Sequence, residues 1–298
     1  SYGENKDVWN TNCSIPKVYR RNLLIKNISG NEKNTTMITL DMNQNEYGIE
    51  HTNGSWQNQG AGVFVDFHFT DKCSVSNLTI SGNVKIGLFN KTDSKLCSVE
   101  KAGNKIGVGG FAARTANSTG AVTFQDFSLK NIDVYGGTMT GGAIGYIDGY
   151  NNNSKRNVTF NNWSIENVNV SKWVENDGSS GGLVGWNVGY GTLKIRRDSN
   201  KDVNIKNLKV TTISDRYDKA AAGGLVGACD FSGVSIENVN ANNVTVTGNY
   251  VRDIGGLIAG KRNGTNIIVT SCVLHSIEVN NPIQNTNGFT GGIIGYHN

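Results

Sequence analysis

Gly181-Gly182-Leu183-Val184-Gly185-Trp186-Asn187 is the stretch that decides the fold of this chain, because its core recurs along the sequence. The recurring unit, which we call the diglycine phrase, has two glycines, two apolar residues and a small residue. Its copies begin at Gly109, Gly141, Gly181, Gly223, Gly255 and Gly291. Successive copies start 32, 40, 42, 32 and 36 residues apart. A unit repeated at such a period is typical of supersecondary repeats that stack into a solenoid.

A second phrase, apolar-x-Asn-apolar-x-apolar, alternates with the first, as in Ile165–Val170. On a straight strand Ile165 would lie on the face opposite Val168 and Val170, so all three reach one core only if the chain turns at Asn167. Asparagine tolerates the left-handed backbone conformation that such a corner needs. In stacked coils these side chains would form a hydrogen-bonded ladder. The predicted corner ladder comprises Asn27, Asn77, Asn131, Asn167, Asn207 and Asn238.

Together the phrases predict an all-β fold, a single-domain parallel β-helix (solenoid) of about seven or eight coils. Each coil would have three short strands, tight corners at the Asn and at the diglycine, and long loops on one side. The 38 glycines and two prolines favour strands and turns over helices. We expect one coil per repeat, with two leaner coils per repeat as the alternative. Residues 1–22 form an N-terminal arm or cap, and residues 23–298 the repeat domain, irregular over 23–108 and regular over 109–298.

Charge and hydropathy argue against two classes of partner. The net charge is +4 without a dense basic run, which favours an ordinary solvated surface over nucleic-acid binding. No run approaches the ~20 apolar residues that span a bilayer, so we expect no membrane span. The sequence begins at Ser1 rather than Met, which we interpret as a processed or trimmed product; removal of a signal peptide would explain it.

Asparagine is unusually frequent, with 42 residues and thirteen Asn-x-Ser/Thr sequons. That is about twice what this composition gives by chance, and the sequon is the acceptor for N-linked glycans. The excess favours an extracellular glycoprotein, with Asn- and Thr-rich composition as the alternative explanation. Asn27 and Asn77 occupy corners and are expected to stay unmodified. The expected acceptors are Asn12, Asn34, Asn53, Asn90, Asn117, Asn152, Asn157, Asn162, Asn169, Asn243 and Asn263.

Five cysteines lie too far apart for a Cys-x-x-Cys metal site. Cys73 with Cys97, and Cys229 with Cys272, are the candidate disulfides, although spacing alone does not fix the connectivity. Cys13 is then left over. It would either bridge to another molecule or stay a buried thiol.

No catalytic constellation stands out, and we expect neither an enzyme nor a bound cofactor or metal. The carboxylates are scattered, and the four histidines share no motif spacing. Glu166, Glu237 and Glu278, with Lys130 and Lys206 among them, are read as one surface column of alternating charge. A polysaccharide lyase or glycosidase is therefore the least favoured function.

Aromatic residues follow the diglycine phrase at one fixed offset, as at Tyr146, Trp186 and Tyr296. Aromatic rings of this kind can stack on sugars. We favour a stacked structural column over a sugar-binding surface, because the offset is constant.

The copies at Gly181–Gly185 and Gly223–Gly227 resemble the GLUG repeat of bacterial surface proteins, over roughly residues 84–298. The resemblance implies an extracellular β-solenoid with a surface or adhesin-like role. The sequon excess and the longer loops depart from the bacterial pattern and point to a eukaryotic secretory source.

The last residues, Gly291–Asn298, complete a diglycine phrase and no capping element follows. Uncovered strand edges favour pairing with another molecule. We therefore expect an extracellular structural glycoprotein, the subunit of a head-to-tail homopolymeric filament. Its partners would be further copies of itself and covalent N-linked glycans. The alternative is a monomeric cell-surface adhesin or glycan-binding stalk.

Overall fold

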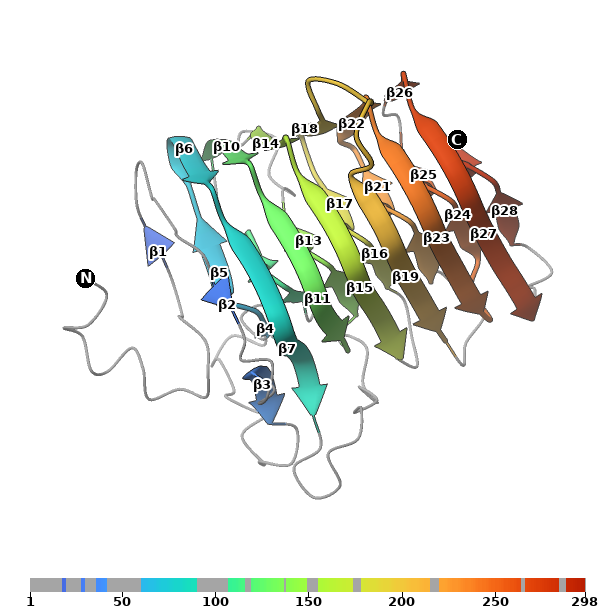
Figure 1. Ribbon diagram of the computed structural model, residues 1–298, viewed down its shortest axis with the longest axis horizontal. Coiled ribbons are helices and arrows are strands. Elements are labelled where there is room, and N and C mark those ends of the chain that lie inside the picture. The colour runs from blue at the N-terminus through green and yellow to red at the C-terminus, as the bar shows by residue number, and fades with distance from the viewer. Residues whose placement is uncertain are drawn as a thin grey trace.

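The computed structural model describes residues 18–19, 28–29, 36–41, 60–89, 107–115, 119–136, 138–148, 155–173, 178–214, 220–263, 266–283 and 288–297. All regular structure in these ranges is β-strand. The predicted arm, residues 1–22, lies outside them except for Val18–Tyr19. Within the described residues, the fold is the predicted all-β parallel solenoid (Figure 1).

The strands form four parallel sheets, named S1 to S4 in the order in which each coil visits them. S1 contains β6 (Thr70–Ser76), β10 (Thr119–Gln125), β14 (Arg156–Asn161), β18 (Gly191–Arg196), β22 (Gly233–Glu237) and β26 (Ile267–Thr270). S2 contains β2 (Ile28–Ser29), β3 (Thr36–Asp41), β7 (Thr79–Phe89), β11 (Ser128–Tyr135), β15 (Ser164–Trp173), β19 (Ile205–Ile213), β23 (Asn240–Asn249) and β27 (Val273–Ile283).

The other two sheets meet at the diglycine corner. S3 contains β4 (Gly60–Ala61), β8 (Gly107–Gly109), β12 (Met139–Gly141), β16 (Ser179–Gly181), β20 (Ala221–Gly223), β24 (Asp253–Gly255) and β28 (Phe289–Gly291). S4 contains β1 (Val18–Tyr19), β5 (Phe64–His68), β9 (Ala112–Arg114), β13 (Ile144–Ile147), β17 (Val184–Val188), β21 (Val226–Asp230), β25 (Ile258–Arg262) and β29 (Ile294–His297).

Each coil passes through S1, S2, S3 and S4 once, so one repeat is one coil. In the described residues six complete coils run from β6 to β29, after an incomplete coil that includes β3, β4 and β5. The stack is slightly shorter than the seven or eight coils expected. A coil also has four strands, not three, because the residues before each diglycine form the short S3 strand.

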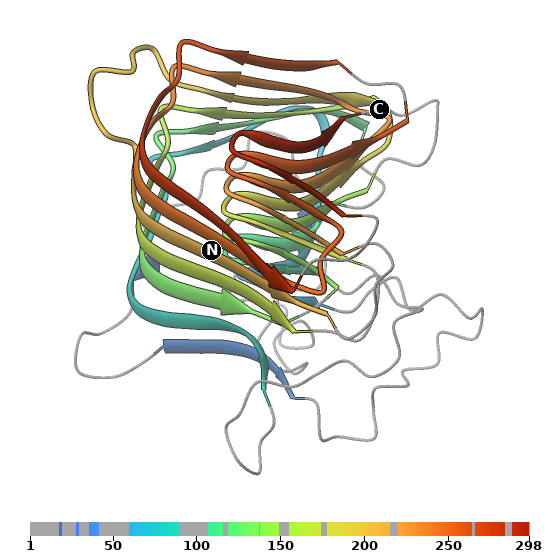
Figure 2. The same cartoon turned by 90° about the vertical axis from the view of Figure 1, so that its right-hand side faces the viewer.

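S3 and S4 form a narrow V whose diglycine apex points into the angle between S1 and S2 (Figure 2). A Cβ on Gly142 would lie 3.2 Å from Leu129 Cδ1 of S2, and one on Gly182 would lie 2.6 Å from Leu208 Cδ2. The apolar core fills the space between the V and the outer sheets. It is rich in aromatic rings near the N-terminal coils, with Phe124 stacked on Phe160 at 4.7 Å, and mostly aliphatic beyond Trp163.

One loop projects away from the side on which the other loops gather (Figure 2). It comprises residues 197–204, between β18 and β19, and stands at the corner where S1 meets S2. Asn238 Nδ2 donates to the Arg197 carbonyl at 2.8 Å, and Asn200 Nδ2 donates to the Ser271 carbonyl at 3.0 Å. The loop therefore braces the two coils that follow it.

Candidate functional site

The diglycine corners pack directly against one another along the stack. A Cβ built on the second glycine would lie only 2.2 Å from the next coil's carbonyl oxygen at Gly110, 2.0 Å at Gly142, 2.2 Å at Gly182, 1.9 Å at Gly224 and 2.0 Å at Gly256. No side chain can occupy such a position without moving the backbone. Since none of these glycines has a left-handed φ, the corner needs glycine for close approach and not for unusual backbone angles.

In the incomplete coil, Val63 stands where later coils have the second glycine. Val63 donates its N–H to the Gly110 carbonyl, a role that glycine takes in later coils, and this hydrogen bond is 3.5 Å long. The equivalent bond from Gly110 to Gly142 is 3.0 Å. Where valine stands in place of the second glycine, the backbone hydrogen bond to the next coil is thus longer.

The last coil, β26–β29, leaves the same corner open. A Cβ on Gly292 would meet no atom of the described structure within 4 Å. Its neighbour Ile293 is 46% exposed, whereas Leu257, which occupies the equivalent position one coil earlier, is 0% exposed. We name the surface around Gly292 and Ile293, formed by β26–β29, the C-terminal face.

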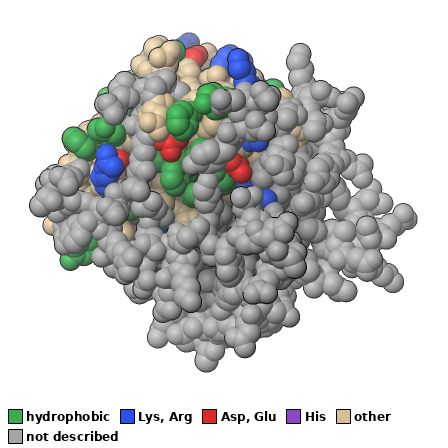
Figure 3. All heavy atoms as spheres, turned by 180° about the vertical axis from the view of Figure 1, so that it is seen from behind, with side chains coloured by type: hydrophobic (Ala, Val, Ile, Leu, Met, Phe, Trp, Pro, Cys, Tyr) green, Lys and Arg blue, Asp and Glu red, His purple; other side chains and the backbone are tan. Residues whose placement is uncertain are grey.

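The rest of the last coil shows the same change. Val269 pairs in register with the fully buried Ile236, and Ile277 pairs with the fully buried Val244, yet both last-coil residues are only partly buried. Phe289 is 44% exposed, whereas its partner Asp253 in the preceding coil is 1% exposed. Hydrophobic side chains reach the surface toward this end in Figure 3. Within the described residues, the C-terminal face therefore exposes a cross-section of the core.

An aromatic cluster fills the V of the last coil. The rings of Phe289 and Tyr296 stack with centroids 4.6 Å apart, and the Arg252 guanidinium lies 5.4 Å from the Tyr296 centroid. Arg252 Nε also lies 3.6 Å from Asp253 Oδ1. The cation and the stacked rings hold this part of the C-terminal face in place.

The coils near the N-terminus are closed. Ala61 and Phe64 of the incomplete coil are each 2% exposed, and Phe67 and Phe69 are 0% exposed. Apolar core positions are therefore open in the coil β26–β29 and closed at these four positions toward the N-terminus.

The predicted ladder residues fall into two columns. Asn131, Asn167, Asn207 and Asn243 occupy one position of S2, and each later Nδ2 donates to the preceding Oδ1 at 2.7 to 2.9 Å. Their φ angles lie between 52° and 60°. Asn243 is an additional member that the predicted ladder lacks, although Ala241–Val246 also fits the second phrase. Asn27 lies outside the described residues.

Asn77 and Asn238 occupy the other column, at the corner from S1 to S2. They share it with Asp126, Asn162 and Ser271, and all five have φ between 50° and 56°. The second phrase therefore marks any left-handed residue between two core-facing pairs. It occurs at two places in a coil.

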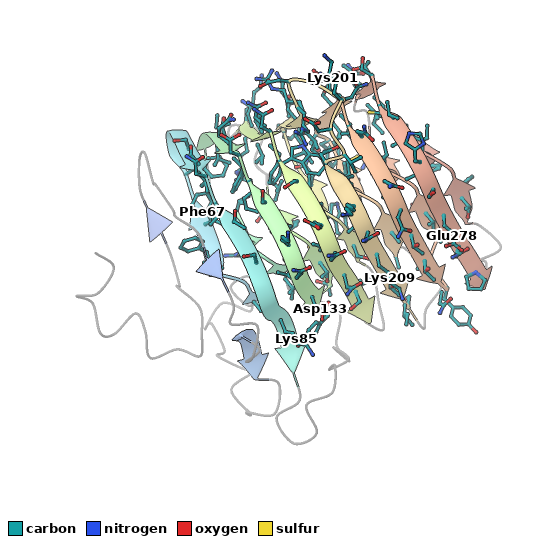
Figure 4. All side chains as sticks on the ribbon, in the orientation of Figure 1. Phe67, Lys85, Asp133, Lys201, Lys209 and Glu278 are labelled. Carbon is teal, nitrogen blue, oxygen red and sulfur yellow. The ribbon has the colours of Figure 1, made fainter. Side chains whose placement is uncertain are left out.

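The charged column is shorter than expected. Lys130, Glu166 and Lys206 are successive partners in S2, with Nζ–Oε distances of 3.0 Å and 3.8 Å. The hydrogen bond from Lys130 is the main cause that lowers the pKa of Glu166. Glu237 belongs to S1, and Glu278 lies in another S2 column, so they do not extend this column. Figure 4 shows that second column, with Lys85, Asp133, Lys209 and Glu278 along the outer face.

Five predicted glycan acceptors lie in described residues, and all have side chains on the flanks of the solenoid. Asn157, Asn169, Asn243 and Asn263 are exposed, and Asn162 is half-buried. The Nδ2 atoms of Asn162, Asn169 and Asn243 donate to Asp198, Asp133 and Asn207. The other predicted acceptors, Asn12, Asn34, Asn53, Asn90, Asn117 and Asn152, lie outside the described residues.

Cys229 and Cys272 are not joined in a disulfide. Cys229 is buried in S4 and donates to the Gly260 carbonyl at 3.4 Å, whereas Cys272 follows the S1–S2 corner of the last coil and donates to the Thr270 carbonyl at 3.3 Å. A one-repeat separation in sequence does not bring them together, because they belong to different corners. Cys13, Cys97 and the side chain of Cys73 lie outside the described part of the structure.

The aromatic residues at fixed offset form part of one S4 column. Tyr146 pairs with Trp186, but Ala228 and Gly260 continue the column before Tyr296. Trp186 packs over the small residues Ala221, Ala228 and Ala259. A separate aromatic pair, Tyr190 and Phe231, lies on the turns from S4 to S1 with ring centroids 5.9 Å apart.

No group of three or more metal-binding side chains occurs in the described ranges. Nor do these residues contain a helix long and apolar enough to cross a membrane. No protein-family model matches the chain, and neither a curated protein nor a solved structure matches it.

Proposed function

We propose that this chain is a non-enzymatic structural subunit of an extracellular filament, in which the C-terminal face of one copy receives a β-coil from a second copy. The observation that carries the proposal is the open core cross-section of β26–β29. Ile293 is 46% exposed, whereas the equivalent Leu257 is 0% exposed. A Cβ on Gly292 would meet no described atom within 4 Å, whereas a Cβ on Gly256 would lie 2.0 Å from the Gly292 carbonyl oxygen.

The backbone of the last coil favours a strand as the occupant. Among the described strands, β26, β27, β28 and β29 are the C-terminal edges of all four sheets. Edge strands present N–H and C=O groups that pair with any strand laid beside them. An added coil would also cover Phe289 and Ile293, whose exposed apolar area favours association.

A second copy fits best when its N-terminal region is the donor. Every strand pair in the stack is parallel, so a continuing coil must run in the same direction. Two C-terminal faces meeting each other would bring their strands together antiparallel. A contact between unlike ends does not close on itself and therefore generates a filament.

The distribution of sequons is compatible with an uncovered C-terminal face. The last sequon is Asn263, and residues 266–298 contain none, so no N-glycan would stand on the last coil. The sequon excess and the motif-level GLUG resemblance support an extracellular location, which we include in the proposal.

Electron microscopy of the purified chain across a dilution series tests this function. We expect unbranched fibres that persist on dilution, and we expect deletion of residues 1–22 to remove them if that arm supplies the donated strand. Short rods of one length at every concentration would contradict the proposal. In that case the C-terminal face would have to be covered by further chain of a longer protein.

A further inference from the structure

The turns from S4 to S1 place three residues in one column. Gly189, Phe231 and Asn263 follow the paired strand ends of β17, β21 and β25, because Val188 pairs with Asp230 and Asp230 pairs with Arg262. All three have left-handed φ angles, of 101°, 57° and 57°. Glycine and asparagine are the residues that suit this conformation, and phenylalanine is not. The ring at position 231 is therefore held at a conformational cost.

One face of the Phe231 ring is covered by an aromatic neighbour. It stacks on Tyr190, which belongs to the preceding turn, with an angle of 25° between the planes. Phe231 remains 41% exposed. Tyr190 lies toward the N-terminal end of the stack, so the uncovered side of the Phe231 ring is toward the following coil, which carries Asn263. Successive coils lie about 4.8 Å apart, which is within reach of a group attached to the Asn263 side chain.

Asn263 is exposed and begins the sequon Asn263-Gly264-Thr265. It shares its column with an exposed aromatic ring, Phe231. This juxtaposition combines an acceptor for a sugar with a surface on which a sugar ring can pack.

We propose that Asn263 carries an N-linked glycan whose first N-acetylglucosamine packs its apolar face on the Phe231 ring, as the third layer of a stack that begins with Tyr190. The glycan comes from a lipid diphosphate-linked oligosaccharide of the secretory pathway. A bond forms between Asn263 Nδ2 and the anomeric carbon, the bond from that carbon to the diphosphate oxygen breaks, and Nδ2 loses a proton. The inference rests on the extracellular location in the proposed function.

A packed sugar would offset the cost of holding Phe231 in a left-handed conformation. An aromatic ring offers a large apolar surface, and fixing it costs little conformational entropy. The C–H groups of a pyranose ring can pack against its face. Without a partner, an exposed phenylalanine in a left-handed turn is costly to both stability and solubility. With the glycan in place, the ring is covered on both sides.

The test uses the full chain secreted from cells that perform N-glycosylation, trimmed enzymatically to one N-acetylglucosamine per site. Glycopeptide mass mapping reports whether Asn263 is occupied. The N-acetyl methyl proton resonance of the Asn263 sugar is assigned by its loss in Thr265→Ala. Phe231→Asn removes the ring, keeps a residue that accepts a left-handed φ, and creates no sequon because residue 233 is glycine.

We expect Asn263 to be occupied, and its methyl resonance to be shifted upfield by the ring current in the wild type but not in Phe231→Asn. The glycan should raise the Tm of the wild type by about 2 °C and leave that of Phe231→Asn unchanged. A bare Asn263, or the same methyl position in both proteins, would overturn the inference.

Sedimentation of the same samples separates this inference from the filament. A stacked sugar on a protein that stays monomeric would overturn the filament alone. Filaments with an unmodified Asn263 would overturn the glycan alone.

Discussion

The last two coils of the solenoid are built from the same two phrases and differ only in what lies beside them. β22–β25 is packed on both sides, and its corner residues Gly256 and Leu257 are closed. β26–β29 is packed on one side, and Gly292 and Ile293 are open. In a repeat protein each coil is stabilised by its neighbours as much as by its own residues. The second glycine of the phrase is therefore required for close packing at Gly256, whereas the equivalent Gly292 contacts no following coil among the described residues.

The largest loss of stability is expected from a substitution at the diglycine corner of β22–β25. Gly256→Ala would place a Cβ 2.0 Å from the Gly292 carbonyl oxygen and 3.0 Å from Ile277 Cγ2. Forcing these groups apart should destabilise the protein by about 3 kcal/mol or more. Urea unfolding monitored by circular dichroism measures the loss. A change below about 0.5 kcal/mol would show that the coils are not in contact at this corner.

The next largest loss of stability is expected from shortening the apolar side chain that follows the diglycine. Leu257→Ala opens a cavity in a closed core and should cost about 2–4 kcal/mol. Ile293→Ala, one coil later, should cost about 1 kcal/mol or less in the monomer, because nearly half of that side chain is already exposed. Equal losses in the two variants would mean that Ile293 is covered in solution.

A smaller effect is expected in the asparagine ladder. Asn207 has φ 56°, donates to Asn167 and accepts from Asn243. Asn207→Gly keeps the backbone conformation and loses two exposed hydrogen bonds, for about 0.5–1 kcal/mol. Asn207→Ala also loses the tolerance for a left-handed φ and should cost about 1 kcal/mol more. If alanine is no worse than glycine in thermal unfolding, the bend at this residue is not under backbone strain.

The smallest effect is a pH dependence confined to the last coil. Burial raises the pKa of the Cys272 thiol, and a backbone hydrogen bond from Val239 partly opposes the rise. A folded-state pKa above the unfolded value gives stability that is complete below the unfolded pKa and is lost as pH rises through the folded pKa. Hydrogen exchange in β26–β29 should therefore accelerate above about pH 9, relative to inner coils.

Alkylation of Cys272, followed by peptide mass mapping, provides a second reading of the same pKa. Its rate should rise with pH at a midpoint above that of a free cysteine, whereas the buried Cys229 should stay unreactive. Cys272→Ser should remove the accelerated exchange at high pH. A midpoint at or below the free-cysteine value would contradict the assignment.

The sequence predicted the repeat and its corners well because close packing of coils leaves a bare backbone at one place in every coil. Gly142 and Gly182 are glycines for that reason, and the period follows directly. The short S3 strands gave no such signal. Met139–Gly141 and Ser179–Gly181 are only three residues long and end in glycine, so they are too short to show apolar alternation.

Positions within a coil were harder to assign from spacing. Asn77 and Asn131 stand in the same local pattern, yet one lies at the S1–S2 corner and the other within S2. Both have φ 53° and both separate two core-facing pairs, so only the pairing register distinguishes them. The same limit explains Cys229 and Cys272, which lie about one repeat apart along the chain but belong to different corners.

The residues of the last diglycine corner do not distinguish it from a closed corner, since Gly291–Gly295 repeats the inner phrase. The measurement that tests the meaning of its openness is analytical ultracentrifugation of the wild type beside Gly292→Ala. The monomer should fold at least as well in the variant, because the new Cβ meets no described atom and alanine restricts the unfolded chain. In a stacked assembly that Cβ would face the next coil's backbone, as at Gly224. We predict large, dilution-resistant species for the wild type and a sharply reduced assembled fraction for Gly292→Ala. Assembly that is unchanged in the variant would contradict stacking on the C-terminal face.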